Sequence, residues 1–429
     1  MKASFFSSVF YMGQAAAGWP TPKTHYSDVE AKQSMQTALE HYRVAEEVGF
    51  DWLSLAEHHF GPVGLTPNPM VFAGLLTQVA KRAKIALLGA TIPILNPVRV
   101  AEEFAMLDVL TEGRVVAGML RGTPNEYVTY NVNPAESRGR FEEAMELIRY
   151  AWTQTEPFAW QGRYFQYRAI SIWPRPVQLP HPPIYMSGSS PESGVFAAQA
   201  RVSLGLAVTT VPRATKAAEL YRQTARNNGW EPTVDNILYR MSFHVAETDE
   251  QAIADYETSK NYPQRLSPIA MNQGLERVVA GTGYYGSEVD KNSARNLRAA
   301  GLEDRVREGQ VVIGGPDTVV AQLKAIKDTL NPGVLDLNSA FRSASGRRSR
   351  SACSARRSCR ASGNFKDTNL SRVRESEAPI AISDGRVRVS RSPSPSFGQA
   401  HLFAEPSQPS PSMGRGALTR FVAAYGRSR

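Results

Sequence analysis

The chain has 429 residues, 42% of them hydrophobic, which is enough for one large domain or two ordinary ones. Its net charge of +9 does not indicate an acidic partner, because residues 339–429 carry 16 Arg and 1 Lys against 3 Glu and 2 Asp, a net of +12 that leaves −3 for residues 1–338. Both cysteines, Cys353 and Cys359, lie in this basic tail, which excludes a disulfide framework or cysteine metal site in residues 1–338. No apolar run is long enough to span a membrane and the N-terminus is a poor signal peptide, so we expect a soluble, cytoplasmic protein with no membrane partner.

Short apolar runs in residues 1–338 predict eight strands that alternate with helices, as in a parallel α/β protein. The runs are 3–10, 52–56, 85–92, 115–119, 184–187, 204–209, 238–245 and 334–337. Eight strands are the number that a closed (β/α)8 TIM barrel requires. A doubly wound open sheet would show the same alternation.

Amphipathic stretches between these strands predict helices at 33–48, 70–80, 98–110, 138–152 and 316–329. Asn96 can cap the helix that begins at Pro97, whose missing N–H has no cost at the first helical position. Gly49 can end the first helix in a left-handed conformation, and Pro316 opens the last one.

Two further segments depart from the strand–helix alternation. The aromatic-rich segment 157–178 contains Gly162 between two alternating runs, which predicts a hairpin. The segment 259–310 is polar and irregular, which suggests an insertion between the seventh strand and its helix.

The tail, residues 339–429, is rich in Ser and Arg and lacks apolar periodicity, so we expect it to be disordered. It begins where the eighth strand ends and so stands in place of the helix that should cover that strand. Such an abrupt change of composition is what an altered reading frame would produce, a hypothesis that resequencing the gene would test. Residues 1–338 are therefore expected to form the barrel domain, with the tail as a separate region.

The segment 56–122 carries a series of motifs in a distinctive order. They are Ala56-Glu57-His58-His59-Phe60, Asn68-Pro69, Asn96-Pro97-Val98-Arg99-Val100-Ala101-Glu102-Glu103, Gly113-Arg114 and Gly118-Met119-Leu120-Arg121-Gly122. In order and spacing they resemble the luciferase-like flavin monooxygenases, the family of the bacterial luciferase alpha subunit. The resemblance continues more loosely to about Asn338 and favours the barrel over the open sheet.

The resemblance implies a cofactor, a reaction and partners. Such a protein would bind reduced FMN supplied by a separate flavin reductase, and O2 would add to the flavin to give a peroxide. That species would oxidise a small organic substrate such as an aldehyde or a ketone. Family members associate through barrel helices, so a homodimer is plausible. The insertion at 259–310 would form a lid over the site.

Glu57, His58 and His59 follow the predicted second strand, at the barrel end where active sites lie. Because side chains alternate, His58 should face away from Glu57 and His59. Adjacent histidines alone more often form a packed, hydrogen-bonded pair. The resemblance makes His58 the acid or base beside the flavin, a role that suits a group titrating near neutrality, with Glu57 and His59 as supports.

Three further places are candidates for cofactor binding by the same resemblance. Gly89 and Ala90 end the third strand beneath the flavin ring, where small residues allow close approach, although ordinary strand packing explains them equally well. Arg121 would contact the flavin phosphate, a group that a guanidinium binds in bidentate fashion, where the alternative is a rim arginine paired to a carboxylate.

The third place is the run Ser189-Ser190-Pro191-Glu192-Ser193 before a helix. Hydroxyl groups and free backbone N–H groups at a helix N-terminus form an anion site, so the resemblance assigns Ser189, Ser190 and Ser193 to the phosphate. Without the resemblance, a simple helix cap explains these serines equally well.

Two other function classes are compatible with the same residues. A deazaflavin-dependent oxidoreductase is the enzymatic alternative, and a non-catalytic flavin-binding protein is the other. No glycine-rich nucleotide fingerprint or Walker motif is present, and no metal-ligand spacing is convincing. The basic tail could bind nucleic acid non-specifically, but a solvated tail explains its charge without a specific nucleic-acid partner.

Overall fold

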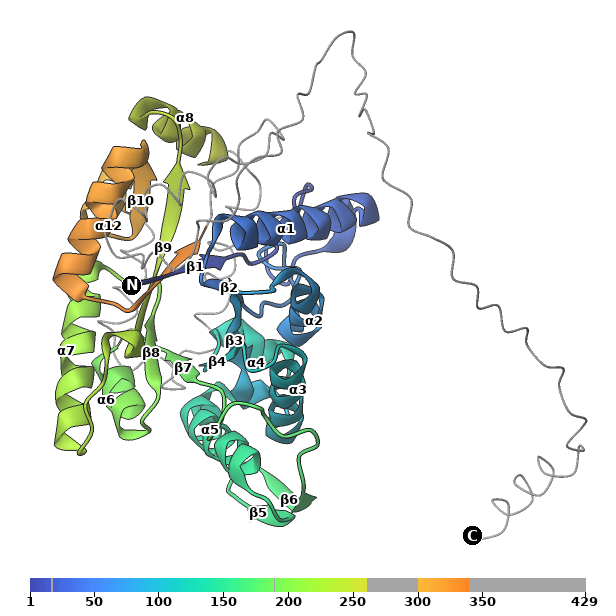
Figure 1. The fold of residues 1–429 in the computed structure, drawn as a ribbon. Coiled ribbons are helices and arrows are strands. Elements are labelled where there is room, and N and C mark those ends of the chain that lie inside the picture. Colours follow the sequence, from blue (N-terminus) through green and yellow to red (C-terminus); the bar gives the residue numbers. More distant parts are fainter. Residues whose placement is uncertain (17, 189, 261–299, 339–429) are drawn as a thin grey trace, which may run out of the picture. The chain divides into compact units, whose positions relative to one another are not determined.

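Eight parallel strands close into a barrel in the computed structural model, which describes residues 1–16, 18–188, 190–260 and 300–338 (Figure 1). The strands pair in the order β1, β2, β3, β4, β7, β8, β9, β11, and β11 returns to pair with β1. The predicted (β/α)8 barrel is therefore confirmed. The barrel strands are β1 Lys2–Phe6, β2 Trp52–Leu55, β3 Lys84–Thr91, β4 Val115–Leu120, β7 Ile184–Ser187, β8 Ser203–Leu206, β9 Ile237–Val245 and β11 Val334–Asn338.

Helices cover the outside of this barrel, and neighbours along the chain pack on one another. Contacts join α1 to α2, α2 to α3, α3 to α5, α6 to α7 and α7 to α12 (Figure 1). The helices are α1 Asp28–Val48, α2 Pro69–Val79, α3 Pro97–Leu110, α4 Pro124–Thr129, α5 Ser137–Thr153, α6 Pro191–Gln199, α7 Val211–Asn227, α8 Asp249–Lys260, α11 Leu302–Arg307 and α12 Pro316–Leu330. None of the described helices is long and apolar enough to cross a membrane.

The predicted helix ends have the expected chemistry. The Asn96 side chain accepts hydrogen bonds from the backbone N–H groups of Val98 and Arg99, and Pro97 occupies the first helical position of α3. Gly49 ends α1 with φ +93°, a left-handed conformation that glycine adopts without steric cost. The segment 157–178 contains the predicted hairpin, formed by β5 Phe158–Gln161 and β6 Gln166–Ile170.

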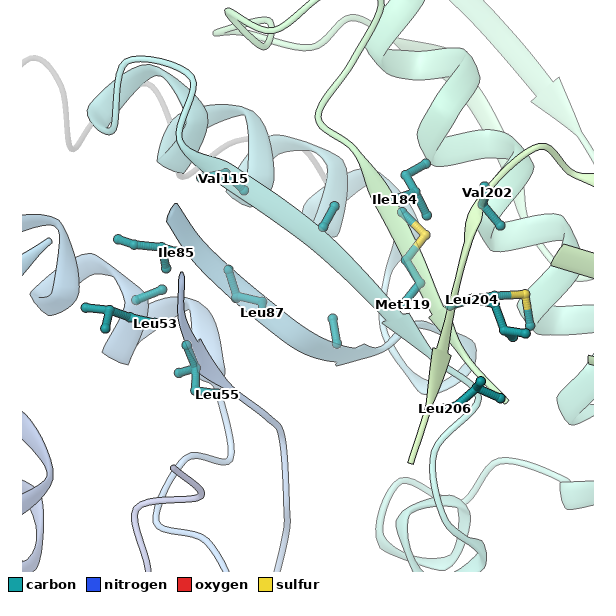
Figure 2. Packing of buried hydrophobic residues seen from close by; sticks show 14 of the residues in the cluster. Leu53, Leu55, Ile85, Leu87, Val115, Met119, Ile184, Val202, Leu204 and Leu206 are labelled. Carbon is teal, nitrogen blue, oxygen red and sulfur yellow. The ribbon is translucent and has the colours of Figure 1, made fainter. Parts of the chain in front are cut away.

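Side chains alternate between two layers along each barrel strand, which divides the apolar core in two. One set packs between the strands and the helices, and Figure 2 shows Leu53, Leu55, Ile85 and Leu87 among its members. The other set forms a separate cluster of residues that alternate with the first set along the same strands. It consists of Trp52, Ala86, Leu88, Val116, Tyr185, Leu238 and Val334. Both sets lose solvent contact, as in a filled barrel rather than a pore.

A polar network links four strands within the barrel. The guanidinium of Arg240 on β9 donates to Asp336 of β11 at 2.5 Å and to the Leu88 carbonyl of β3 at 3.4 Å. The other Asp336 oxygen accepts from the Ser54 hydroxyl of β2 at 2.6 Å. Asp336 is fully buried, and the Arg240 guanidinium lies 3.5 Å from the centre of the Phe6 ring. Buried charges need such partners, so this pair is expected to fix the relative positions of these strands.

Several element boundaries differ from the sequence expectation. The first and sixth strands end at Phe6 and Leu206, earlier than predicted, because Val9 and Val208 have φ near +50°, which an extended strand cannot contain. A strand that the sequence did not predict, β10 Val311–Gly314, pairs in parallel with β9.

The segment expected to be irregular, 259–310, contains the helix α11 just before β10. The remainder of the predicted insertion, residues 261–299, and the tail, residues 339–429, lie outside the described residues.

Candidate active site at the mouth of the barrel

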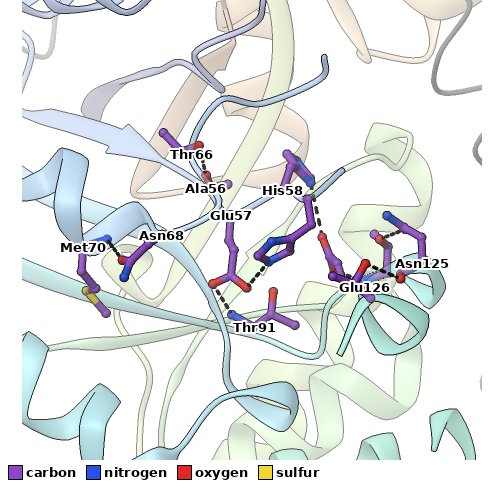
Figure 3. Close-up of polar contacts among 12 residues, drawn as sticks. Ala56, Glu57, His58, Thr66, Asn68, Met70, Thr91, Asn125 and Glu126 are labelled. Atoms are coloured by element: carbon purple, nitrogen blue, oxygen red, sulfur yellow. Dashed lines mark hydrogen bonds and ion pairs between the residues drawn. The ribbon is translucent and has the colours of Figure 1, made fainter. Parts of the chain in front are cut away.

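The C-terminal ends of neighbouring strands bring polar side chains together at one end of the barrel (Figure 3). Glu57, His58 and His59 follow β2, and Thr91 ends β3. Glu126 belongs to the short helix α4, which follows β4. Parallel neighbours end at the same rim, so residues that are far apart in the sequence meet there.

Glu57 and His59 form a buried pair. His59 Nε2 lies 2.9 Å from Glu57 Oε1, and their side chains are 2% and 1% exposed. Glu57 Oε2 accepts from the Thr91 backbone N–H at 3.2 Å. The His59 ring also meets the Tyr130 ring edge to face, with centroids 5.1 Å apart. Burial, with the nearby Glu57 carboxylate, raises the pKa of the Tyr130 hydroxyl.

His58 faces a different carboxylate. Its Nδ1 lies 3.4 Å from Glu126 Oε1, within ion-pair distance but without hydrogen-bond geometry. The His58 side chain is 27% exposed, whereas the Glu126 side chain is 1% exposed. The expected opposite orientation of the two histidines is confirmed, since His59 turns to Glu57.

Glu126 was not among the residues selected from the sequence. Its Oε2 accepts from the Thr123 backbone N–H at 2.6 Å and forms a capping box at the start of α4. The sequence signal was present, because Thr123-Pro124-Asn125-Glu126 has the Thr-x-x-Glu spacing of such a box. That spacing predicts a helix start, but it does not predict that the second carboxylate oxygen faces His58.

The backbones of β3 and β4 approach each other closely below this rim. The peptide bond between Leu88 and Gly89 is cis, and the strand register shifts between Leu87 and Ala90. A Cβ at Gly89 would lie 2.2 Å from the Gly118 carbonyl oxygen, and a Cβ at Gly118 would lie 2.0 Å from the Leu87 oxygen. Only glycine fits at both positions. Gly89 and Ala90, the two predicted here, are buried at this contact.

Arg121 and Gly122 lie directly after β4. The Tyr127 hydroxyl donates to the Arg121 carbonyl and so ties the turn to α4. Gly122 has φ +87°, and a Cβ there would lie 2.4 Å from Thr91 Cγ2. Arg121 is half-buried.

The predicted serine run lies at the start of α6. Ser190 caps this helix by accepting from the Ser193 backbone N–H, and the two hydroxyl groups are 3.1 Å apart. Ser189 lies outside the described residues. Hydrogen bonds from the Glu192 backbone N–H and the Ser190 hydroxyl lower the pKa of the Glu192 carboxyl. These donors lie at the N-terminus of α6, where backbone N–H groups favour negative charge.

Unpartnered polar atoms gather at the same end of the barrel. Among the residues that the structure describes, five buried side-chain atoms have no hydrogen-bond partner: His58 Nδ1, Thr91 Oγ1, Asn125 Nδ2, Thr209 Oγ1 and Asn338 Oδ1. Each belongs to a residue at or shortly after the C-terminal end of a barrel strand. Buried polar groups normally have partners, so this concentration is what a polar ligand site requires.

In the described part of the chain, no group of three or more His, Asp, Glu or Cys side chains could hold a metal ion. His244 lies on β9 and contacts Asp255 of α8 at 2.9 Å. It therefore belongs to the packing of α8 rather than to the cluster around His58.

Comparisons with known proteins agree with this geometry. The family model described as luciferase-like monooxygenase matches residues 16–331. The chain is 28% identical to an alkanal monooxygenase alpha chain of Photorhabdus luminescens over 51% of this chain and 60% of that one. It is 27% identical to limonene 1,2-monooxygenase of Rhodococcus erythropolis over 71% and 75% of the two chains. The chain spans about half the length of the first curated relatives it matches.

Solved structures share the fold at lower identity. The oxygenating constituent of 3,6-diketocamphane monooxygenase from Pseudomonas putida, in complex with FMN, has a TM-score of 0.60 and 19% identity, covering 79% of this chain and 92% of that chain. A secondary alcohol dehydrogenase that depends on a deazaflavin coenzyme has a TM-score of 0.58 and 17% identity, covering 79% and 93%. With its barrel, its Glu-His-His rim and a model match over residues 16–331, the chain belongs to the luciferase-like monooxygenase family.

Proposed function

We propose that this protein is the oxygenase of a two-component monooxygenase that uses reduced FMN and O2 to oxidise a small organic substrate. The observation that carries the proposal is a set of buried polar atoms without hydrogen-bond partners that lie, among the described residues, at the barrel mouth: Thr91 Oγ1, Asn125 Nδ2, Thr209 Oγ1 and Asn338 Oδ1. They belong to residues at or shortly after the C-terminal ends of β3, β4, β8 and β11. A site built this way presents hydrogen-bonding groups to a ligand that is itself polar and largely enclosed.

The residues at this mouth fit a flavin nucleotide. The flavin ring would lie against the backbone near Gly89 and Ala90, where β3 closely approaches β4. Arg121, with the Ser190 and Ser193 hydroxyl groups at the N-terminus of α6, would hold the phosphate, and we extend this role to Ser189. Bound reduced flavin would supply the two electrons that let one oxygen atom enter the substrate while the other leaves as water.

His58 is the proposed acid or base of the site. It is the most exposed member of the two carboxylate–imidazole pairs, and imidazole exchanges protons near neutral pH. Glu57 and His59 hold the rim, because their hydrogen bond and the Thr91 N–H contact tie β2 to β3. Enclosure of a bound ligand by this rim would exclude water from the reacting atoms.

A separate flavin reductase is the proposed electron donor. No glycine-rich nucleotide fingerprint follows a strand in the sequence, so the chain has no recognisable nicotinamide site of its own. A reductase that releases reduced FMN would therefore supply the cofactor.

A homodimer through α2 and α3 is also proposed. These two helices contact each other and present exposed apolar side chains. The side chains are Val71 and Leu75 on α2 and Met106, Val109 and Leu110 on α3, from 41% to 68% exposed. Contiguous exposed apolar surface of this kind is typical of protein–protein interfaces.

The second candidate function is hydride transfer with a deazaflavin coenzyme, favoured by the structural similarity to the deazaflavin-dependent dehydrogenase. The two functions differ in where the oxygen in the product comes from. We would supply reduced FMN by a reductase, add isotopically labelled O2 and a panel of aldehydes and ketones, and analyse products by mass spectrometry. Labelled product supports the monooxygenase.

A matched reaction with the reduced deazaflavin coenzyme serves as the comparison. Substrate reduction without label would favour the dehydrogenase instead. If the protein bound FMN but gave no product with either coenzyme, the result would favour a non-catalytic flavin-binding protein.

A further inference from the structure

Glu126 divides its two carboxylate oxygens between two tasks. Oε2 accepts from the Thr123 backbone N–H at 2.6 Å and so caps α4. Oε1 lies 3.4 Å from His58 Nδ1, on a side chain that is only 1% exposed (Figure 3). Capping needs a single acceptor oxygen. The second oxygen is therefore available to act on the imidazole ring.

The Glu57–His59 pair has the same arrangement but is almost fully buried. There one oxygen accepts from the Thr91 N–H, and the other lies 2.9 Å from the ring of a histidine that is almost fully buried. His58, by contrast, is 27% exposed, and its Nδ1 has no hydrogen bond. The two pairs share their construction but differ in access, so His58 is the histidine that a ligand at the mouth can reach.

We propose that Glu126 is the positioning residue of His58. A carboxylate accepts hydrogen bonds and does not donate them, while neutral imidazole carries one hydrogen on one of its two nitrogens. The hydrogen is therefore favoured on Nδ1, facing Glu126, and Nε2 is left as the bare nitrogen that takes up a proton. The second nitrogen of a functional histidine commonly has its state set in this way by a carboxylate.

This proposal extends the proposed function, since proton exchange at Nε2 matters only if His58 serves the reaction. The position of the hydrogen itself, however, is a property of the protein without any cofactor. The two claims can therefore be tested apart.

Glu126→Gln separates capping from positioning. The amide oxygen of the glutamine can still accept from the Thr123 N–H, whereas its NH2 group then faces His58 Nδ1. An NH2 group donates, so it favours a bare Nδ1 and moves the hydrogen to Nε2. The substitution should reverse the state of the ring without removing the helix cap.

The first test is nuclear magnetic resonance of the full-length, ligand-free protein with its seven histidines labelled with nitrogen-15. His58→Gln assigns the resonances of His58. We expect Nδ1–H in the wild-type protein and Nε2–H in Glu126→Gln. Finding the hydrogen on Nε2 in the wild-type protein would overturn the proposal, and this spectrum decides the point even if the variant does not fold.

Thr123→Val is the matched control. It removes the hydroxyl of the same capping box but leaves the Glu126 carboxylate opposite His58, so the state of the ring should not change. If the hydrogen of His58 moved in Thr123→Val as it does in Glu126→Gln, the helix cap, and not the Glu126 carboxylate, would determine which ring nitrogen carries it.

Turnover is the second readout. Glu126→Gln should bind FMN as the wild-type protein does and turn over about 10²-fold more slowly, the lower range for loss of a general acid or base. If the hydrogen of His58 moved to Nε2 in Glu126→Gln while turnover stayed at the wild-type rate, the positioning role of Glu126 would be contradicted. A wild-type protein with the Nδ1–H state but no turnover with any flavin would instead count against the proposed function.

Discussion

Adjacent histidines acquire different environments at the barrel rim. The strand β2 ends at Leu55, and the chain that leaves it turns His59 toward Glu57 and His58 toward Glu126. Their difference in exposure, 27% against 2%, is what separates a group that can meet a ligand from one that holds the rim. Because the residue type is the same, only burial and hydrogen-bond partners distinguish the roles proposed for His58 and His59.

His58→Ala tests this separation. We expect the variant to bind FMN like the wild-type protein and to lose about 10²- to 10⁴-fold in turnover, the usual contribution of a general acid or base. Titration of FMN and oxygen uptake with substrate measure the two effects. His181→Ala is the control, since His181 lies in a loop against Trp152 on the outer side of the barrel. If His58→Ala turned over substrate as fast as His181→Ala, His58 would have no role in the reaction.

The close contact between β3 and β4 predicts the effect of a single glycine substitution. Gly118→Ala should lower the free energy of unfolding by about 1–3 kcal/mol or more, because its Cβ would lie 2.0 Å from the Leu87 oxygen. It should also weaken FMN binding by displacing Gly89. Gly74→Ala in α2 is the control, since no atom lies within 4 Å of its added Cβ.

Urea unfolding and FMN titration would show the outcome of the Gly118→Ala substitution. The control is expected to gain roughly 0.5–1 kcal/mol from helix propensity. A Gly118→Ala protein as stable as the control, with full flavin affinity, would show that the close approach of the two strands is not needed.

The local order of the sequence identifies some residues of the candidate site but not others, for a physical reason. The Glu57-His58-His59 run and Arg121 are identifiable by local order, and the structure places both at the rim. Glu126 was missed, because its role depends on β2 and β4 lying on either side of β3. Such proximity is set by strand order, which one short motif does not encode.

Whole elements were predicted more accurately than their ends. Capping residues such as Asn96 and Gly49 marked helix ends correctly, because their chemistry is local. Strand ends were less accurate where single residues such as Val9 adopt positive φ. The strand β10 was missed because Val311–Gly314 is only four residues long and follows a polar segment.

The buried pair of Arg240 and Asp336 gives a prediction for how the strands are held. Arg240→Met leaves the Asp336 carboxylate buried without its cation, which should lower the free energy of unfolding by about 3–5 kcal/mol. Adding Asp336→Leu removes the uncompensated charge, so the double variant should recover most of this loss.

Urea denaturation of the wild-type, single and double variants measures the coupling between Arg240 and Asp336. In both variants the Leu88 carbonyl loses its Arg240 donor, so the stability that the double variant does not recover reports on that lost hydrogen bond. A double variant no more stable than Arg240→Met would show that the packing of the arginine, and not its charge, holds these strands.

At the scale of the molecule, the closed barrel gathers residues from distant parts of the chain. The mouth receives groups from β2, β3, β4, β8 and β11, and a family match over residues 16–331 accompanies it. The fold class was predictable, because eight apolar runs and a motif series both point to a barrel. The pairing of charges inside it was not, because it depends on the register between β9 and β11, which places Arg240 beside Asp336.

The proposed homodimer predicts a specific response to surface substitutions. Leu75→Asp on α2 and Leu110→Asp on α3 should each convert a dimer to monomers, because they place a charge in an apolar interface. Leu220→Asp on α7, an exposed leucine on another helix, should leave the association unchanged. Sedimentation velocity over a range of concentrations distinguishes these outcomes, and a wild-type protein that stays monomeric would refute the dimer.

The central claim is that the barrel mouth binds a reduced flavin nucleotide. The most direct test is an anaerobic titration of the purified protein with oxidised and with reduced FMN, repeated with Arg121→Met. We expect saturable binding that is tighter for the reduced form and weaker for both forms in the variant, since the variant loses a phosphate contact. A folded wild-type protein that binds neither form would contradict the account.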